Sequence, residues 1–278
     1  MTEIPNQISK AELLRALHRG PKILVLPNAW DVASARIFED AGASAIATTS
    51  AGIAFTLGYP DGQKISREEM LAVVARIAAK VKLPMSADVE AGYGDRPEDA
   101  AKTAGAVIEA GAVGLNLEDS AGDPQHPLVD LALQLEKIAA VRETAHSMRV
   151  PLVLNARTDV FLLGVGKPES RFDEALRRLA AFRDAGADCL FIPGIRDLPS
   201  IEEFTRELRH PVNILAGPGS PSVSELQKAG VARVSLGSSP ARAAFGLARR
   251  VAQEVLTAGT YKNLEGAPAH GEINQLLK

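Results

Sequence analysis

Short apolar runs alternate with amphipathic stretches along almost the whole chain, and this alternation constrains the fold more than any other feature. The eight runs are 23–26, 44–49, 84–88, 113–117, 152–156, 189–192, 212–215 and 233–236. Between them, stretches such as 68–81 and 131–145 carry apolar residues at spacings of three and four, which is typical of helices with one buried face. Strands that alternate with such helices predict βα units and a parallel sheet.

The residues before the runs alternate as well. The odd-numbered runs begin at or near a proline, and the even-numbered runs follow an Ala-Gly pair. A glycine in that place supplies the left-handed residue that ends a helix, so that the chain can turn directly into a strand. The prolines are Pro21, Pro84, Pro151 and Pro211, and the glycines are Gly42, Gly111, Gly186 and Gly230. Four such pairs predict an α/β fold of the (β/α)₈ TIM-barrel type rather than an open sheet.

No change of composition divides the chain, so residues 1–278 are predicted to form a single barrel domain. A short helix at 9–19 is expected before the barrel, with Ser9 as its N-cap and Glu12 in the capping-box position. Residues 241–256 predict a last long helix. The tail 259–278 has weak periodicity and is expected to be a partly ordered end.

Composition and charge narrow the class of protein. Of the 278 residues, 46% are hydrophobic and 23% charged, as in ordinary globular enzymes, and the net charge of −3 provides no basic field for nucleic acid. The only cysteine, Cys189, lies in an apolar run, which excludes a disulfide within the chain and predicts a packing role. No apolar stretch reaches the length of a membrane span, and the N-terminus lacks a leader pattern. We therefore expect a cytoplasmic protein with no nucleic-acid and no membrane partner.

Acidic residues close two of the apolar runs. Asp88 and Glu90 follow the third run, and Glu118 and Asp119 follow the fourth. Carboxylates at the ends of buried strands are costly unless they meet a cation or hydrogen-bond donors. Oxygen ligands without nearby His or Cys favour a hard ion such as Mg²⁺ or Mn²⁺. The alternative is that these acids cap the following helices or pair with surface arginines.

In a (β/α)₈ barrel the active site lies at the C-terminal ends of the strands, which is where these acids are expected. Two connections there, 51–65 and 120–128, are longer than usual and are candidate lids.

The motif Asp-Val-Glu-Ala-Gly-Tyr-Gly at 88–94, followed by Glu118-Asp119, resembles the isocitrate lyase/phosphoenolpyruvate mutase superfamily. The resemblance extends from Asn28 to Gly237 and is fairly specific. It implies cleavage or formation of C–C or C–P bonds in small carboxylates with Mg²⁺ or Mn²⁺. It also implies a homo-oligomer, a dimer or tetramer, in which the last helix packs against a neighbouring subunit.

The resemblance also assigns roles to single residues. Asp88 would bind the metal directly, and Glu90, Glu118 and Asp61 would hold its water shell. Thr49, Ser50 and Ala51 would receive the substrate carboxylate, and Arg157 would contact the substrate. Trp30 matches a pocket-wall residue, although a lone tryptophan can equally belong to the core. Tyr93 would contact the site or only pack beneath it, and Asp159 is expected to cap the next helix.

Departures from the superfamily pattern indicate which kinds of superfamily enzyme this chain does not resemble. The loop at 120–127 lacks the catalytic Cys of the lyases and the Lys and Asn of the mutases, and only His126 has a counterpart there. Ala47 stands where those lyases often have Tyr. A true isocitrate or methylisocitrate lyase and a mutase are therefore disfavoured. His126 would protonate the product or be an ordinary exposed histidine.

Decarboxylation requires fewer groups than retro-aldol cleavage, because a metal can stabilise the enolate that remains. We therefore expect Mg²⁺-dependent C–C cleavage of a small 2-oxo or 2-hydroxy dicarboxylate, similar to oxaloacetate decarboxylation. The alternatives are C–P cleavage of phosphonopyruvate-like substrates, or binding of a 2-oxo acid without turnover.

Overall fold

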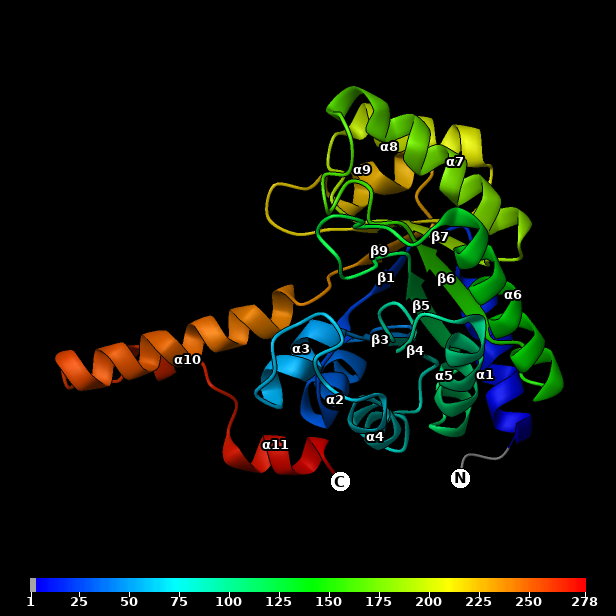
Figure 1. Cartoon of the computed structure of the whole chain (residues 1–278). Helices are drawn as coiled ribbons and strands as arrows, with labels where there is room; N and C mark the ends of the chain where they lie inside the picture. Colours follow the sequence, from blue (N-terminus) through cyan, green and yellow to red (C-terminus); the bar gives the residue numbers. More distant parts are fainter. Residues whose placement is uncertain (1–3) are drawn as a thin grey trace.

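The structure, a computed structural model, describes residues 4–278 and confirms the predicted barrel (Figure 1). All the strand pairings are parallel, and the sheet order is β1-β9-β8-β7-β6-β5-β4-β3-β2. The strands are β1 Leu24–Leu26, β2 Asn28–Ala29, β3 Ile46–Thr48, β4 Met85–Asp88, β5 Gly114–Glu118, β6 Val153–Arg157, β7 Cys189–Ile192, β8 Val212–Leu215 and β9 Arg233–Ser235. Each of the eight predicted runs contains a strand.

The barrel closes through a single interrupted strand. β1 pairs with β9, and β2 pairs with β3, so the two ends of the sheet are consecutive in the chain and separated only by Pro27. Proline has no N–H to donate to a sheet, which explains the interruption, but its carbonyl still accepts a hydrogen bond of 3.0 Å from the Ala47 N–H. The fold is therefore a (β/α)₈ barrel whose first strand is split.

Helices follow the strands, and all of them except the last, α10, which extends away from the barrel, lie around its outside (Figure 1). They are α2 Val32–Asp40, α3 Ser50–Thr56, α4 Arg67–Ala78, α5 Pro97–Glu109, α6 Leu131–Ser147, α7 Arg171–Asp184, α8 Leu198–Leu208, α9 Val223–Lys228 and α10 Ser239–Thr257. The glycines of the four Ala-Gly pairs have φ between 81° and 101°, as their predicted role at helix ends requires.

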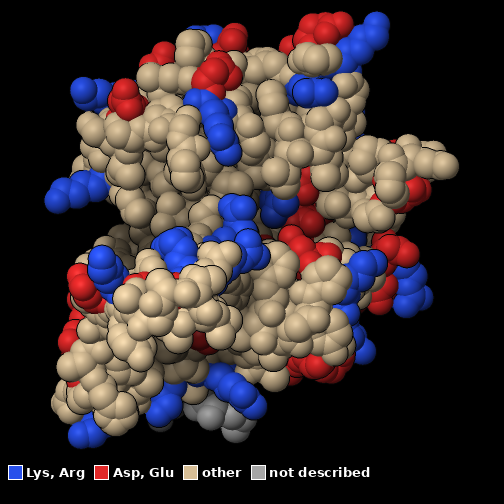
Figure 2. All heavy atoms as spheres, turned by 90° about the vertical axis from the view of Figure 1, so that its left-hand side faces the viewer, with Lys and Arg blue, Asp and Glu red and all other residues tan. Residues whose placement is uncertain are grey.

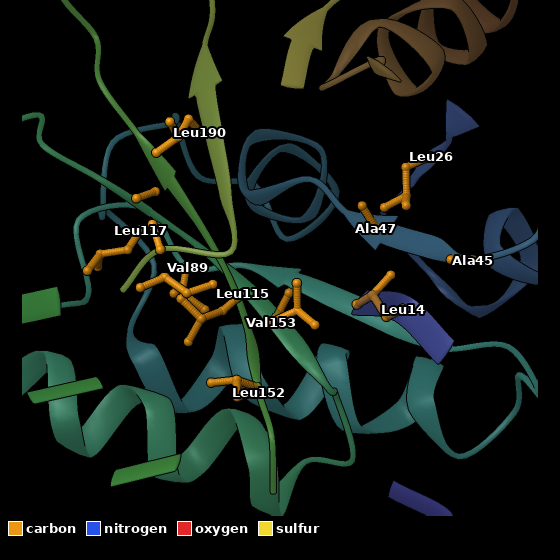
Figure 3. Packing of buried hydrophobic residues seen from close by; sticks show 14 of the residues in the cluster. Leu14, Leu26, Ala45, Ala47, Val89, Leu115, Leu117, Leu152, Val153 and Leu190 are labelled. Atoms are coloured by element: carbon orange, nitrogen blue, oxygen red, sulfur yellow. The ribbon is translucent and has the colours of Figure 1, made fainter. Parts of the chain in front are cut away.

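Aliphatic side chains fill the interior and the space between the strands and the helices. Figure 3 shows Leu115, Leu117 and Val153 clustered on the neighbouring strands β5 and β6. Leu14 of helix α1 (Ile4–Leu17) is fully buried at the N-terminal end of the barrel. A Cβ added at Gly114 would lie only 2.9 Å from Leu14 Cδ2, so the glycine permits α1 to pack closely there. Cys189 is also fully buried, and burial raises the pKa of its thiol to about 12, in agreement with a packing role.

Three local expectations were wrong. The first helix begins at Ile4 rather than at residue 9, so Ser9 lies inside it and is not its N-cap. The connection 51–65, expected to be a long loop, starts as helix α3, which Thr49 caps. The tail 259–278 contains a 3₁₀ turn, η2 Lys262–Leu264, and a helix, α11 His270–Leu276.

The tail returns to the barrel after α10 has left it (Figure 1). Arg36 Nε on α2 donates a hydrogen bond of 2.9 Å to the carbonyl of Leu276 in α11. Helix α10 itself buries only Ala241. Within residues 4–278, none of the helices is both long and apolar enough to cross a membrane.

Candidate active site

A cavity of about 410 Å³ opens at the C-terminal ends of the strands, where a barrel enzyme has its active site. Residues from most of the strand ends contribute to its wall. They include Asn28, Thr49, Ser50, Ala51, Asp61, Asp88, Asn116, Arg157, Phe191, Arg196, Gly217, Ser235, Ser238 and Arg242. Six of the predicted site residues therefore meet in one cavity: Thr49, Ser50, Ala51, Asp61, Asp88 and Arg157.

Asp88 ends β4 and is held from two sides. Its Oδ2 accepts hydrogen bonds from the Ser50 N–H at 3.0 Å and from the Ser50 hydroxyl at 2.9 Å. Its Oδ1 accepts one from Asn116 Nδ2 at 3.3 Å. Ser50 is the first residue of helix α3, whose N-terminal end favours negative charge. The carboxylate is thus fixed in one orientation at the cavity wall.

Two further acids lie close to Asp88. Asp61 lines the cavity, and its pKa is raised by burial and by the charge of Asp88. Burial, Asp88 and Asp61 together raise the pKa of Glu90 to about 7. Glu90 accepts hydrogen bonds from the Gln63 N–H at 2.5 Å and from the Tyr93 hydroxyl at 3.3 Å, and Tyr93 itself does not line the cavity. The negative charges of Asp88, Asp61 and Glu90 repel one another, and a bound cation would neutralise them.

Arg157 is held by two carboxylates. Its Nη1 lies 2.8 Å from Glu118 Oε2, and its Nε and Nη2 lie 2.5 Å and 2.9 Å from the two oxygens of Asp159. Burial alone would lower the pKa of Arg157, but these two acids raise it above its ordinary value. The guanidinium also lies 5.6 Å from the centre of the Phe191 ring. Asp159 therefore orients Arg157, and the prediction that it caps a helix was wrong.

Asn116, which lines the cavity, is bonded to two fully buried polar residues, Asn155 and Arg233, and neither Asn116 nor Arg233 was expected in the site. Asn155 Nδ2 donates to Asn116 Oδ1 at 2.7 Å, and Arg233 Nη2 lies 3.4 Å from the same oxygen. Because Asn116 Oδ1 accepts from two donors, its amide nitrogen is directed to Asp88. The sequence does contain a sign of these residues, because asparagine and arginine occur within strands that are otherwise apolar. Arg233 is fully buried, which is unusual for a charge in a barrel core.

Four predicted residues do not line the cavity. Trp30 packs beside Phe38, with ring centres 6.4 Å apart, and against the small cluster around Ile53. The His126 side chain is 82% exposed, and its Nδ1 is paired with Asp123 at 3.1 Å. Glu90 and Glu118 are not part of the cavity lining; the two oxygens of Glu90 accept from Gln63 and Tyr93, and Oε2 of Glu118 is paired with Arg157.

The acidic residues at and near the cavity are suited to a cation that takes only one or two ligands from the protein. Within residues 4–278, no three His, Cys, Asp or Glu side chains are placed to bind one ion directly, so Asp88, Glu90 and Glu118 do not form a direct ligand set. Mg²⁺ commonly binds through one or two carboxylates and keeps several waters. Asp88 at the cavity wall, with the negative charges of Asp61 and Glu90 close by, meets that requirement.

Two proteins are similar to this chain over most of its length. A crystal structure of a Burkholderia cenocepacia J2315 protein, assigned as a lyase/mutase, is 41% identical with a TM-score of 0.92 and covers 98% of this chain and 96% of its own. A protein of Mycobacterium tuberculosis (strain ATCC 25618 / H37Rv) is 37% identical over 240 residues, which are 86% of this chain and 87% of the relative.

More distant relatives have named activities. Oxaloacetate decarboxylase 2 of Pseudomonas fluorescens (strain Pf0-1) is 27% identical over 79% of this chain and 74% of its own length. A phosphonopyruvate hydrolase, solved with oxalate and Mg²⁺, is 25% identical with a TM-score of 0.83 over 96% of this chain and 94% of its own.

The profile of the phosphoenolpyruvate phosphomutase family matches residues 14–256, most of the chain. A 2,3-dimethylmalate lyase with a TM-score of 0.83 is itself a member of the PEP mutase/isocitrate lyase superfamily. The chain therefore belongs to the phosphoenolpyruvate phosphomutase family, and it is an enzyme of the PEP mutase/isocitrate lyase superfamily of carbon–carbon lyases and mutases.

Proposed function

We propose that this enzyme cleaves a C–C bond next to the carbonyl of a small 2-oxo dicarboxylate, as in the decarboxylation of oxaloacetate, and that it uses Mg²⁺ or Mn²⁺. The observation that carries this proposal is the position of Asp88 and Arg157 in one cavity. Asp88 offers a fixed carboxylate beside two further acids, and Arg157 offers a fixed guanidinium. A 2-oxo acid together with a divalent cation complements both groups.

The chain's own residues bind and orient the substrate. Arg157 would hold a carboxylate through its two remaining N–H groups, because Glu118 and Asp159 bind only three of its five donors and the guanidinium keeps its charge when buried. Thr49 caps helix α3 through a 3.3 Å hydrogen bond from the Gly52 N–H, and Ser50 bonds to Asp88. Among the described residues the Ala51 N–H has no acceptor, so it would be available to a substrate oxygen at this helix start.

A cation bound at Asp88 would polarise the 2-oxo group and withdraw the negative charge that develops when the bond breaks. Glu90 and Glu118 would hold water around it, and Asp61 would protonate the carbon that retains the bonding electrons. We assign this proton transfer to Asp61 because it lines the cavity, whereas His126 is exposed outside it.

C–P cleavage is the second candidate. The phosphonopyruvate hydrolase named above shares the fold, and the same 2-oxo acid end would be held by Asp88 and Arg157 in either reaction. The similarity to oxaloacetate decarboxylase 2 of P. fluorescens supports C–C cleavage. The two reactions differ in the group that leaves.

We also propose a homo-oligomer built around α10. This helix of 19 residues buries a single side chain within the described chain, and Phe245, Leu247 and Leu256 are 41%, 44% and 84% exposed. An apolar helix face of this kind is typical of an interaction surface. A neighbouring subunit would cover it.

The test is a panel of oxaloacetate, phosphonopyruvate and 2-methylisocitrate, each incubated with enzyme and Mg²⁺ or with EDTA. Products are identified by NMR, and the rate for each acid with Mg²⁺ alone is subtracted. We expect pyruvate from oxaloacetate and loss of turnover in EDTA. Free phosphate from phosphonopyruvate would select the second candidate, and binding without any product over hours would contradict both.

A further inference from the structure

Arg233 crosses the interior of the barrel. When β1 and β2 are counted as one split strand, β9 takes the eighth position of the ring and β5 takes the fourth, so these two strands lie on opposite sides. Arg233 belongs to β9, yet its Nη2 lies 3.4 Å from Oδ1 of Asn116 on β5. A side chain can join opposite strands only through the space that the barrel encloses. The guanidinium therefore lies inside the barrel, although Arg233 does not line the cavity itself.

The charge of Arg233 is not balanced by an ion pair. Figure 2 shows Lys, Arg, Asp and Glu side chains projecting from one face of the molecule, whereas Arg233 is fully buried. Its Nε donates to the Ser235 hydroxyl at 3.2 Å, and within residues 4–278 its Nη1 has no hydrogen-bond partner and no acid pairs with it. A buried cation without an acid costs stability, and an apolar side chain of similar volume is often no less stable. Stability therefore does not explain an arginine at this position.

Arg233 is connected to Asp88 through a single side chain. Asn116 Oδ1 accepts from Arg233 Nη2 and, at 2.7 Å, from Asn155 Nδ2, while Asn116 Nδ2 donates to Asp88 Oδ1 at 3.3 Å. The charge of Asp88 also acts on Arg233 through space, since burial lowers the pKa of the guanidinium whereas Cys189 and Asp88 raise it. Only two hydrogen bonds thus separate the buried cation from the carboxylate at the cavity wall.

The two groups that bond to Asn116 Oδ1 differ in what they can offer. The amide of Asn155 has both a donor and an acceptor end, and among the described residues its Oδ1 has no hydrogen-bond partner, so its two ends could be exchanged. Arginine has donors only. Arg233 therefore determines that Asn116 presents its carbonyl oxygen to the barrel interior and its amide nitrogen to Asp88.

The opposite orientation of Asn116 would make it a cation ligand. It would place the carbonyl oxygen where Nδ2 now lies, 3.3 Å from Asp88 Oδ1, and Asn116 lines the cavity. Adjacent oxygens around Mg²⁺ are about 3 Å apart, because each lies about 2.1 Å from the ion in an octahedral arrangement. Carbonyl oxygens are also ligands that suit Mg²⁺ and Mn²⁺. A cation at Asp88 would therefore attract this oxygen if nothing held it away.

We propose that Arg233 is a positioning residue that keeps the carbonyl oxygen of Asn116 away from the cation. Asn116 then supports Asp88 through its amide nitrogen and does not occupy a coordination position. The positions left open are those that a 2-oxo acid and water need, and the buried positive charge also moderates how tightly the cation binds. The inference rests on the proposed function, since it takes a divalent cation to bind at Asp88.

The test measures Mn²⁺ binding to wild type, Arg233→Met, Asn116→Leu and the double variant. Electron paramagnetic resonance gives the dissociation constant, and the relaxation of water protons gives the number of waters on the bound ion. Asn213→Leu is the matched control, because Asn213 is the sheet neighbour of Arg233 and is equally buried, but it bonds to Ser235 and not to Asn116 or Asp88. Arg233→Leu or Asn116→Ala replaces a variant that melts below wild type.

We expect Arg233→Met to bind Mn²⁺ at least tenfold more tightly than wild type, with one water fewer on the ion. In the Asn116→Leu background the same substitution should leave the number of waters unchanged and give a smaller gain in affinity, because only the removal of positive charge remains. Asn213→Leu should match wild type in both measurements.

The role of Arg233 and the proposed function fail by different results. If wild type bound Mn²⁺ and Arg233→Met kept the wild-type number of waters on the ion, the role of Arg233 would be overturned while the cation site stood. If wild type bound no Mn²⁺, the proposed function would be wrong, and this role of Arg233 with it.

Discussion

Glu118 and Arg157 are direct partners across β5 and β6, and their side chains form an ion pair of 2.8 Å between Oε2 and Nη1. Asp159 occupies the other edge of the same guanidinium. The three side chains have exposures between 2% and 15%, so the pairing is screened little by solvent. This arrangement fixes Arg157 where it lines the cavity.

Arg157→Met should destabilise the protein strongly, because two buried carboxylates would lose their cation. Breaking a buried pair costs about 3–5 kcal/mol in the free energy of unfolding. Arg157→Lys should rescue little, since an ammonium cannot bond both acids through a planar fork. Urea unfolding measures the loss. In an Arg157→Met background, Glu118→Gln should recover part of it, and independent, additive effects would contradict the pairing.

Lys137 supports the loop that carries Glu90. Its ammonium is buried and donates to the carbonyls of Ala91 and Gly94 at 2.7 Å and 2.9 Å. Lys137→Met leaves both carbonyls without that donor, and we expect about 2 kcal/mol less stability. Lys102→Met, an exposed lysine on α5, is the control. Urea unfolding compares the two variants, and equal stabilities would contradict this role of Lys137.

Most of the barrel could be predicted from the sequence, because strands buried on both faces are continuous apolar runs. Ala41-Gly42 and the three similar pairs marked the helix ends, because only glycine adopts their φ readily. Asp88 was identified from its place at the end of an apolar run and Asp61 through a resemblance, and the structure places both carboxylates at one cavity.

Other features of the site and fold depend on contacts between side chains, which cannot be read from the spacing of residues in the sequence. Asp159 follows a strand like a helix cap, but its partner Arg157 becomes evident only when both are buried together. Residues 50–56 contain a glycine and resemble a loop, yet Thr49 caps them as a helix. The first helix begins before Ser9, because Pro5 fits the first turn of a helix.

His18 should make stability depend on pH. Its Nδ1 is paired with the Leu14 carbonyl at 2.7 Å, and burial, with the nearby charge of Arg233, lowers its pKa to about 4. In the unfolded chain His18 takes up a proton below pH ~6.5, whereas in the folded chain it stays neutral until the pH falls to about 4. Stability is therefore complete above pH ~6.5 and falls as the pH drops towards 4.

The measurement compares wild type with His18→Gln by urea unfolding at pH 7 and pH 4.5. Wild type should lose about 2.5 kcal/mol more than the variant over that interval. Equal losses in the two proteins would show that His18 is not held uncharged by the fold.

Helix α10 should control the oligomeric state. Phe245→Glu and Leu247→Glu place charges on its exposed apolar face, and we expect both to shift the protein towards monomer in sedimentation velocity. Leu13→Glu changes an exposed leucine of α1, 49% accessible, and should leave the assembly unchanged. A wild-type protein that sediments as a monomer at micromolar concentration would refute the proposed role of α10.

A divalent cation bound at Asp88 can be detected by electron paramagnetic resonance of added Mn²⁺. Asp88→Asn removes the charge, while its amide oxygen can still accept from Ser50. We expect one Mn²⁺ per wild-type chain, at least 100-fold weaker binding in Asp88→Asn, and unchanged binding in Asp123→Asn, which alters an exposed acid. A folded Asp88→Asn protein that bound Mn²⁺ as tightly as wild type would show that Asp88 does not bind the cation.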